Sequence, residues 1–559
     1  MPSGIVWLNI GYFPQREIVQ DMQRVKFMFS KLGIWLGAIA LIAGLLLHQS
    51  FYPHHIATET INLKRDRERP LVGRLYIPER TKTPYPTIIL WHGVSSSKEM
   101  MEPLAVELAR QGIAAIAFDA GGFGESYARP FSSEENLKDA GVVFDYVRQH
   151  PERFDRSHLG MGGHSMGAAT AIAFGSETAS SEQIRVTIAL GMSAEISRTS
   201  PANLLMGIGL YEELHSPAAM RETLQQGTGE ETQEFQLKGD FQNGSARKLV
   251  ISSTSNHLIE PFDPTLIQEA VVWAVKAFGL HERSVILTSP LVMWGWFLIF
   301  IGSVLSIGYG FRDLNFLKTK LRLVTVGMVA IAGIFLCLGM MGAIPSRMAT
   351  SLVFLVAAVL PISTYAINQP KKLTSFLQLC GLYVSAILIA YAIVSLVMRW
   401  QEFLTHPAYL LGLPQFLVQL PVAMIYSRVQ ELNAAIFPVY SNGLVPSWQL
   451  SLLFLPELIY PSVILSVATR AAAWLVRWLR QPLKLAKVDR PSKKSLQLLG
   501  GLSLVLAIVL IQQARMGTVS MEYAIIAISL LARMALFPAL LVILIVRSPQ
   551  FQALEKRCF

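Results

Sequence analysis

Hydrophobic positions along the chain change their pattern twice. A first apolar run, from Leu32 to Leu47, is followed between about Thr58 and Leu280 by short apolar runs separated by polar and helical stretches. Long apolar runs return beyond Ser284. We therefore predict three parts: an N-terminal segment with a membrane anchor helix (1–52), a folded domain (53–284) and a C-terminal domain of several membrane helices (285–559).

The middle part alternates short β-like runs with helical ones. This alternation is typical of a mostly parallel sheet flanked by helices, so an α/β fold is expected. The predicted strands are Thr87–Trp91, Ala114–Asp119, Leu159–Gly163, Val186–Leu190, Asn203–Ile208 and Lys248–Ser252. The predicted helices are Glu99–Arg110, Leu137–Gln149, Ala168–Phe174 and Pro264–Phe278.

The two outer parts are expected to lie in a membrane. The run from Leu32 to Leu47 is followed by His48, Gln49 and Ser50 rather than a small-residue cleavage site, which favours an uncleaved anchor. Beyond residue 284, most apolar runs are long enough to cross a bilayer. These runs are roughly 286–310, 323–344, 350–367, 374–398, 408–427, 449–469, 496–513 and 522–546.

Composition supports a membrane protein. Of the 559 residues, 52% are hydrophobic and only 15% are charged, which is unusual for a soluble protein. The net charge of +10 comes largely from basic residues beside apolar runs, as in 470–494, and this placement argues against a nucleic-acid partner. An integral, multi-pass protein of a bacterial-type inner or plasma membrane is expected.

The basic loops also predict an orientation. If they are cytoplasmic, the segment from Thr58 to Leu280 lies on the extracytoplasmic side and both termini are cytoplasmic. That arrangement requires an even number of crossings among nine apolar runs. The run 408–427, interrupted by Pro414 and Pro421, is then expected to be a re-entrant or interfacial element rather than a span.

The strongest chemical signal is the sequence Gly163-His164-Ser165-Met166-Gly167 between a predicted strand and a predicted helix. A G-x-S-x-G motif in this context predicts a sharp turn that exposes the serine as a nucleophile, with glycines where side chains would collide. The Met166 N–H, at the start of the helix, is expected to provide half of an oxyanion hole.

The second half of the oxyanion hole should follow an earlier strand. The strand ending at Trp91 runs directly into His92, Gly93 and Val94, so the Val94 N–H is the predicted donor.

A serine nucleophile needs a base and an acid that orients it. Three histidines follow the motif with room for an acid between, namely His215, His257 and His281, and His257 is favoured because it lies just past a strand. The acid should close a strand between Ser165 and the base. Glu212 is preferred there, with Glu213 as the alternative and Asp240 as a more distant one.

These residues give residues 87–280 a resemblance to the α/β-hydrolase superfamily, nearest to its dienelactone-hydrolase and esterase-like branches. The matching features are His92-Gly93, the segment from Phe118 to Ser126, the serine motif and the late histidine. The resemblance implies an eight-stranded sheet, no cofactor and cleavage of an ester, thioester or amide through an acyl-enzyme. The chain departs from it at Glu212, where the family usually has aspartate.

Two ionisable residues fall near the middle of late apolar runs, Glu457 and Arg533. A lone charge at the bilayer centre is costly, so we expect the two to form an ion pair or to line a polar cavity.

Three functions remain open at this point. The first is a serine hydrolase acting on a small-molecule or lipid-like ester that reaches the site from the membrane, with membrane lipid as its other partner and neither a cofactor nor a metal. The second is an acyltransferase that uses the same triad, and the third is a transporter or sensor whose hydrolase-like domain only binds a ligand.

Overall fold

The computed structural model describes a folded central domain and several of the apolar helices. The described residues are 35–53, 56–65, 69–78, 81–94, 96–127, 129, 132–177, 184–193, 195–281, 286–310, 334, 373–436, 537–546 and 548–558. The predicted ion pair of Glu457 and Arg533 lies outside them. So do the predicted runs 323–344, 350–367, 449–469 and 496–513, apart from residue 334, and most of 522–546.

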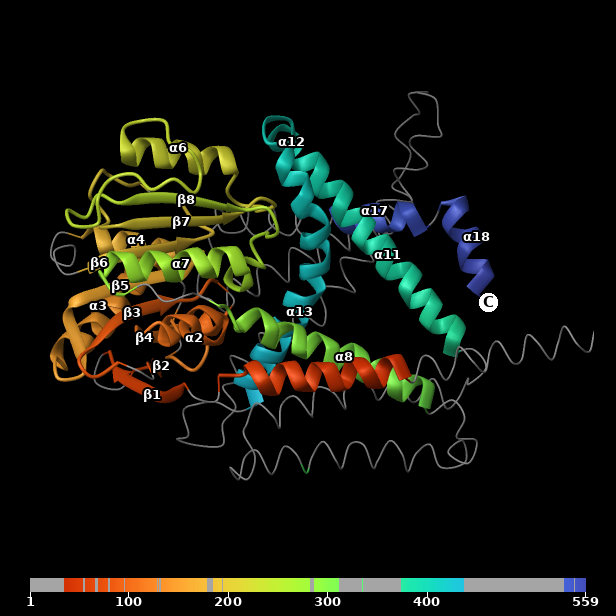
Figure 1. The fold of residues 1–559 in the computed structure, drawn as a ribbon, viewed down its shortest axis with the longest axis horizontal. Helices are drawn as coiled ribbons and strands as arrows, with labels where there is room; N and C mark the ends of the chain where they lie inside the picture. The colour runs from red at the N-terminus through yellow and green to blue at the C-terminus, as the bar shows by residue number, and fades with distance from the viewer. Residues whose placement is uncertain are drawn as a thin grey trace, which may run out of the picture.

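One eight-stranded sheet forms the centre of the domain (Figure 1). The spatial order is β1-β2-β4-β3-β5-β6-β7-β8; β1 pairs with β2 and β2 with β4 in antiparallel fashion, and every other pair is parallel. This confirms the predicted fold of the segment, an eight-stranded and mostly parallel α/β sheet. The strands are β1 Ala57–Lys64, β2 Pro70–Ile77, β3 Tyr85–Trp91, β4 Ala114–Phe118, β5 Phe154–His164, β6 Ile184–Leu190, β7 Leu204–Gly209 and β8 Arg247–Ser252.

The sequence pattern located six of these strands and did not locate β1 and β2. β1 is an edge strand whose side chains are mostly exposed, so it has polar residues at most positions and no apolar run. The central strands β3, β4 and β6 are almost fully buried, and their sequences are therefore mostly apolar.

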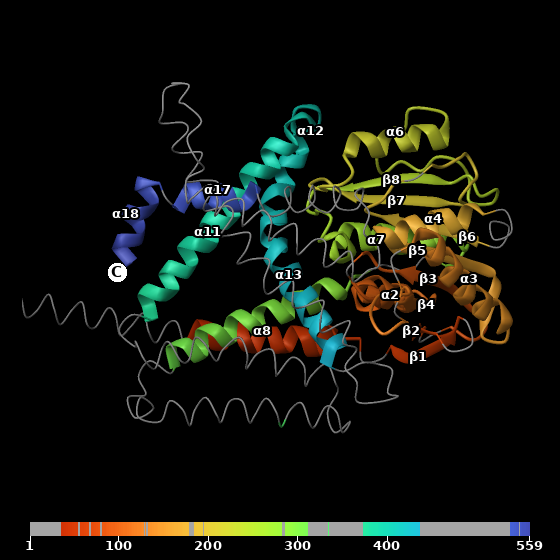
Figure 2. The same cartoon turned by 180° about the vertical axis from the view of Figure 1, so that it is seen from behind.

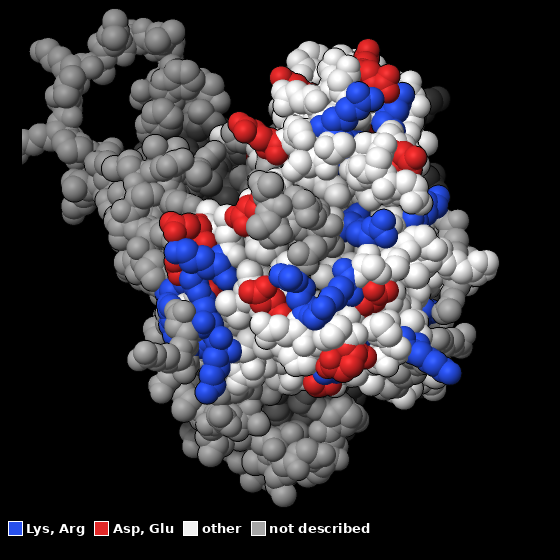
Figure 3. All heavy atoms as spheres, turned by 90° about the vertical axis from the view of Figure 1, so that its left-hand side faces the viewer, with Lys and Arg blue, Asp and Glu red and all other residues white. Residues whose placement is uncertain are grey.

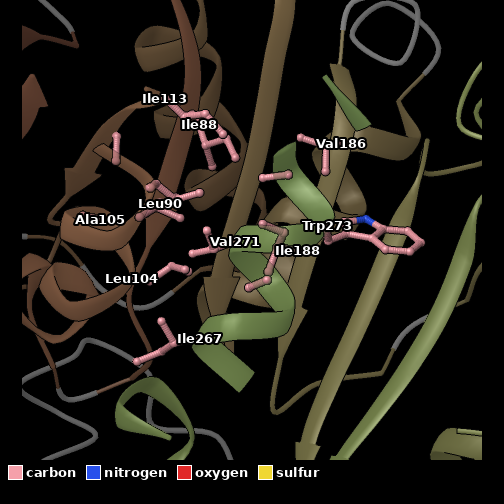
Figure 4. Close-up of a cluster of buried hydrophobic side chains, with 14 of the residues drawn as sticks. Ile88, Leu90, Leu104, Ala105, Ile113, Val186, Ile188, Ile267, Val271 and Trp273 are labelled. Carbon is pink, nitrogen blue, oxygen red and sulfur yellow. The ribbon is translucent and has the colours of Figure 1, made fainter. Parts of the chain in front are cut away.

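Helices cover both faces of the sheet. The α2 helix (Glu102–Arg110) and the α7 helix (Pro264–Ala277) pack on one face, where side chains such as Leu104, Ile188, Val271 and Trp273 form a buried cluster (Figure 4). The opposite face is covered by α3 (Ser133–Gln149) and α4 (Met166–Ser176), with α6 (Pro217–Thr228) near its edge. Short 3-10 helices, η1 (Lys98–Met101) and η2 (Glu260–Phe262), lie in loops at the carboxyl ends of β3 and β8.

Apolar helices extend from one end of the domain (Figures 1 and 2). The helix Trp35–Phe51 lies against α8 (Ser289–Gly310), and glycines permit the approach: a Cβ on Gly44 would lie 2.6 Å from the Ile299 backbone nitrogen. The Glu107 carboxylate on α2 accepts hydrogen bonds of 2.8 Å from the N–H groups of both Thr288 and Ser289. It thereby caps α8 from the folded domain.

The later helices form a second group beside the carboxyl end of the sheet. They are α11 (Leu373–Met398), α12 (Trp400–Thr405), the 3-10 helix η6 (Pro407–Gly412), α13 (Leu413–Ile436), α17 (Phe537–Val546) and α18 (Pro549–Cys558). In both ribbon views α13 runs between the sheet domain and α11, and it crosses α8 rather than running alongside it (Figures 1 and 2). Pro414 lies in its first turn, and the helix continues through Pro421, so neither proline interrupts it.

Two stretches among the described residues are long and apolar enough to cross a membrane, Gly381–Met398 and Pro407–Ser427; a bent pair, Phe537–Val546 with Pro549–Arg557, could make a third. The helices Trp35–Phe51 and Ser289–Ser303 are apolar but shorter. Length and composition do not distinguish a crossing helix from an interfacial one, so the predicted non-crossing role of 408–427 stays a prediction.

Candidate active site

Ser165 occupies the tight turn between β5 and α4. Its backbone has φ 53° and ψ −117°, a conformation that non-glycine residues rarely adopt, and its relative exposure is 7%. The Ser165 N–H donates to the Leu190 carbonyl at 2.8 Å, which links the turn to the end of β6. The serine side chain is therefore held at the carboxyl edge of the sheet in a strained backbone conformation.

Close packing explains the two glycines of the motif. A Cβ on Gly163 would lie 2.5 Å from the Trp91 carbonyl oxygen, and one on Gly167 would lie 2.2 Å from the same atom. Strand β3 thus passes directly behind the turn, and no side chain fits at either position.

The structure brings Ser165 and His257 together across 92 residues of sequence. His257 lies five residues past β8, and its Nε2 is 3.0 Å from the Ser165 Oγ. His215 and His281, the alternatives in the sequence, make no such contact. His215 lies just before the N-cap of α6, and its N–H points to Glu212 at 3.3 Å.

Glu212 contacts the other side of the His257 ring. Its Oε2 lies 2.7 Å from His257 Nδ1, and its Oε1 accepts hydrogen bonds from the N–H groups of Leu214 at 2.7 Å and His215 at 3.3 Å. Burial alone would raise the pKa of the Glu212 carboxyl, but the His257 charge and these hydrogen bonds lower it below the ordinary value. Because an ionised carboxylate only accepts, His257 Nδ1 carries the proton and Nε2 presents its lone pair to Ser165.

Glu213 lies beside the same histidine but contacts its backbone. Its carboxylate accepts hydrogen bonds from Asn256 Nδ2 at 2.9 Å and from the His257 N–H at 3.2 Å. Burial and the adjacent Glu212 charge raise the pKa of Glu213 to about 7. Asp240, the third candidate acid, accepts from the Gln242 N–H in a turn before β8. Of the three carboxyls, only Glu212 contacts the imidazole of His257 through a hydrogen bond.

The predicted oxyanion donors belong to two segments that meet at Ser165. Met166 is the first residue of α4, and the His92–Val94 loop passes close to the serine, since a Cβ on Gly93 would lie 3.3 Å from the Ser165 Cβ. His92 is fully buried; its Nδ1 donates to the Gly93 carbonyl at 2.7 Å, and its Nε2 accepts from the Ala120 N–H at 3.1 Å. The histidine of this loop thus shapes the backbone rather than reaching the reaction centre.

A buried ionic cluster holds Lys98, at the start of η1, a few residues after the His92–Val94 loop. Asp119, directly after β4, accepts from the Lys98 N–H at 2.7 Å and from the Lys98 Nζ at 2.8 Å. The Lys98 ammonium also donates to Glu125 at 2.6 Å. The segment from Phe118 to Ser126, which carried part of the hydrolase resemblance, therefore anchors the η1 loop that leads away from the oxyanion side of the site.

Glu260 is a further residue of the site that the sequence does not predict. This carboxyl lies three residues after His257, is completely buried, and has Oε2 at 3.0 Å from His164 Nε2 and at 3.6 Å from His257 Nδ1. No motif signals it in a single sequence, because its partners come from β5 and β7. His164 was predicted only as part of the turn, and the structure shows that its ring points to this acid.

Within the described residues, His164, His257 and Glu260 also form the group whose ligand atoms are close enough to share a metal ion, all within 4.8 Å of one another. Each of the three already has a protein partner: Glu260 bonds to His164, and His257 donates to Glu212. Hydrogen bonds between protein groups thus hold the three side chains together, although His164 Nδ1 has no hydrogen-bond partner among the described residues.

Helices of the C-terminal group reach the site. The guanidinium of Arg399, between α11 and α12, donates to the backbone carbonyl of Glu212, and Phe416 on α13 stacks on Tyr211 with ring centroids 4.2 Å apart. A small pocket behind the acid is lined by Tyr211, Glu213, Asn256, Tyr391, Val394, Ser395, Met398, Arg399, Phe416 and Pro538. The apolar helices are therefore packed directly against the loop that carries Glu212.

Comparison with known families finds one match, to the serine aminopeptidase family S33, over residues 82–215. The matched segment includes Ser165 and ends before His257. No curated protein matches the chain.

Solved structures with a similar fold include several esterases and hydrolases. An esterase from Pyrococcus furiosus has 17% identity and a TM-score of 0.31, covering 40% of this chain and 93% of its own. Est1E from Butyrivibrio proteoclasticus, solved with ferulic acid, has 16% identity and a TM-score of 0.32, covering 39% and 99%. A serine hydrolase without a lid from Xanthomonas campestris has 18% identity and a TM-score of 0.31, covering 42% and 98%.

Proposed function

We propose that this chain, which is a serine hydrolase, is bound to the membrane and cleaves an ester, thioester or amide through an acyl-enzyme. Ser165 is the nucleophile, His257 the base and Glu212 the acid. The observation that carries the proposal is the continuous contact from Ser165 Oγ to His257 Nε2 at 3.0 Å and from His257 Nδ1 to Glu212 at 2.7 Å.

The proposed reaction has two halves. In the first, the Ser165 hydroxyl attacks the substrate carbonyl carbon while its proton passes to His257 Nε2, and the N–H groups of Met166 and Val94 stabilise the oxyanion. The imidazolium, stabilised by Glu212, then gives the proton to the leaving alcohol, thiol or amine. In the second half, water attacks the acyl-enzyme carbonyl while its proton passes to His257 Nε2. His257 then returns the proton to the Ser165 oxygen, and the product carboxylic acid is released.

The proposed substrate has an apolar part and reaches the site from the membrane. One buried apolar cluster joins the hydrolase domain to the helices: Tyr211 and Phe262 of the domain pack with Phe416, Leu420 and Tyr426 of α13. On the face of the domain turned away from the helices, acidic and basic side chains are intermixed (Figure 3). The apolar residues near the site thus lie on the side where the domain packs against the helices. This favours a lipid-like ester over a highly charged substrate.

We also propose the membrane topology deduced from the basic loops: several crossings, both termini cytoplasmic and the hydrolase domain extracytoplasmic. Reporter fusions test this topology. A C-terminal fusion should report a cytoplasmic location, and one inserted at Gly229, the C-cap of α6, should report the opposite side.

The test of the proposed activity is covalent labelling by a fluorophosphonate probe in membranes that contain the full chain. The intact protein should be labelled and Ser165→Ala should not. Ser157→Ala is the matched control, because Ser157 also bonds to a histidine, at 2.9 Å from His158, but on an exposed surface of the domain. Labelling of Ser165→Ala at the intact rate would refute the assignment.

Substrate class requires a second measurement on the full chain in lipid vesicles. Long-chain esters that partition into the bilayer should be hydrolysed with a higher kcat/KM than short soluble esters of the same leaving group. Equal values would refute the proposed membrane substrate and leave the nucleophile assignment unaffected.

A further inference from the structure

Glu260 contacts three of the segments that build the site. It begins η2, and its Oε1 accepts a hydrogen bond of 2.8 Å from the Gly209 N–H at the end of β7. Its Oε2 lies 3.0 Å from His164 Nε2 in the serine turn and 3.6 Å from His257 Nδ1, the ring atom that Glu212 Oε2 contacts at 2.7 Å. One side chain therefore contacts the nucleophile turn, the acid loop and the loop of the base.

Two fully buried carboxyl groups beside the same ring nitrogen are not both ionised without a large electrostatic cost, so we expect the pair of Glu212 and Glu260 to share a proton. The donors around them decide where it resides. Glu212 receives the N–H groups of Leu214 and His215 and the Nδ1–H of His257, whereas Glu260 receives the backbone N–H of Gly209 and has the neutral His164 ring at 3.0 Å. Glu212 is therefore the ionised partner and Glu260 the neutral one.

The charged and titratable groups around Glu260 agree with this assignment. Glu212 and Glu213 face it from the β7 loop, His257 from its own loop, and His164 from the serine turn. Burial, and then the Glu212 charge, raise the pKa of Glu260 well above its ordinary value. Burial also holds the pKa of His164 well below 6.5, so His164 is neutral and does not balance a second negative charge.

We propose that Glu260 is a positioning residue of the triad: as a neutral carboxylic acid it donates a hydrogen bond to the Glu212 carboxylate and holds that carboxylate against His257 Nδ1. This inference rests on the proposed function of Ser165, His257 and Glu212. If this is correct, a glutamine at position 260, whose amide can also donate a hydrogen bond to Glu212, should preserve the function of Glu260. A side chain without a hydrogen-bond donor, such as alanine, should not.

The test compares Glu260→Gln with Glu260→Ala through the rate of fluorophosphonate labelling of Ser165. The glutamine variant should retain the neutral-pH rate within about threefold, and the alanine variant should lose at least about tenfold, the usual cost of a hydrogen bond to a charged group. At alkaline pH the intact protein should lose rate as Glu260 ionises, and Glu260→Gln should not. Glu269→Gln, at an ion pair with Lys248 on the domain surface, is the matched control.

Either of two results overturns the inference: Glu260→Gln as impaired as Glu260→Ala, or an identical alkaline limb in the intact and glutamine proteins. A purely structural role would not change the alkaline limb. Absence of labelling in the intact protein would instead contradict the proposed function.

A measurement that does not need activity addresses the proton directly. Infrared spectra of Ser165→Ala protein containing carbon-13 glutamate should show a protonated carboxylic acid at neutral pH. The band should be weaker in the Ser165→Ala, Glu260→Gln double variant by the share that Glu260 contributes, and the remainder should belong to Glu213, whose pKa is raised to about 7. A band of equal intensity in both proteins would overturn the inference.

Discussion

The guanidinium of Arg399 donates a hydrogen bond to the backbone carbonyl of Glu212. Arg399 follows α11, which contains one of the two stretches among the described residues that are long and apolar enough to cross a membrane, and Glu212 is the proposed acid, which contacts His257. The position of an apolar helix is thereby coupled to the loop that orients the proposed base. A second link lies nearby, where Arg221 on α6 forms two hydrogen bonds with Glu402 on α12, at 3.1 and 2.8 Å.

Replacing Arg399 tests this coupling. Arg399→Gln should lower the rate of Ser165 labelling by about tenfold, because a charge-assisted hydrogen bond of roughly 1.5–3 kcal/mol is lost from the Glu212 loop. The variant should still insert and fold, as judged by its detergent-extracted yield and melting temperature. Arg148→Gln, an arginine on the exposed side of α3, is the control and should behave as the intact chain. An unchanged rate in Arg399→Gln would show that the helix group does not act on the acid loop.

The acidic side of the pH profile tests the pairing of Glu212 with His257. Burial alone would lower the pKa of His257, but the Glu212 charge and hydrogen bond raise it above 6.5. His257 accepts the serine proton only when neutral, so labelling of Ser165 should fall as the pH drops through that raised pKa. Glu212→Gln removes the charge, so it should move this limb to lower pH and reduce the maximal rate by a factor of about 10³ or more. Glu213→Gln should leave the limb near its original position; the reverse result would make Glu213 the acid.

Much of the site could be predicted because its parts are local. The turn around Ser165 needs a strand, two glycines and a helix within a few residues, and all of these are visible in the sequence. The chain order of serine, acid and histidine also pointed to His257 and placed the acid at Glu212 or Glu213. The expected acid and the expected base each follow a predicted strand. Because the carboxyl ends of parallel strands meet at one edge of a sheet, both were expected to lie near Ser165.

The remaining features depend on distances that a single sequence does not contain. Glu260 contacts His164 and Gly209, which lie 96 and 51 residues away, and nothing in its own neighbourhood marks it as special. Arg399 contacts Glu212 across 187 residues. The sequence preferred Glu212 and kept Glu213 as the alternative, and it could not show which atoms of His257 each carboxylate reaches.

Glu213 should make the stability of the protein depend on pH. Its pKa rises from 4.5 to about 7 on folding, so the folded protein holds this proton more tightly than the unfolded chain. The associated stabilisation is complete below pH 4.5 and is lost as the pH rises through 7, by about 3 kcal/mol at most. Thermal unfolding in detergent should therefore show the melting temperature of the intact protein falling, relative to that of Glu213→Gln, between about pH 5 and pH 8. Glu222→Gln, on the exposed side of α6, should show no such difference; a constant gap for Glu213→Gln would contradict the raised pKa.

Gly191 offers a test of how closely the site is packed. It follows β6 with φ +67°, and a Cβ there would lie 2.1 Å from Glu260 Oε2 and 3.0 Å from His164 Nε2. Gly229, with φ +76°, has nothing within 4 Å of its Cβ position, so an alanine there has a similar backbone cost without the collision. Gly229→Ala should lose roughly 1–2 kcal/mol of stability and retain full labelling of Ser165.

Gly191→Ala should lose more stability than Gly229→Ala and should also slow labelling, because the new methyl group must displace the Glu260 carboxyl from His164 and Glu212. Measuring the two variants side by side by thermal unfolding and by probe labelling separates the backbone cost from the contact with Glu260. If both variants label at the rate of the intact chain, the space between β6 and Glu260 is not needed for the arrangement of the triad. A loss of labelling in Gly191→Ala alone follows from the packing, since the atoms nearest to that methyl group belong to the side chains of Glu260 and His164.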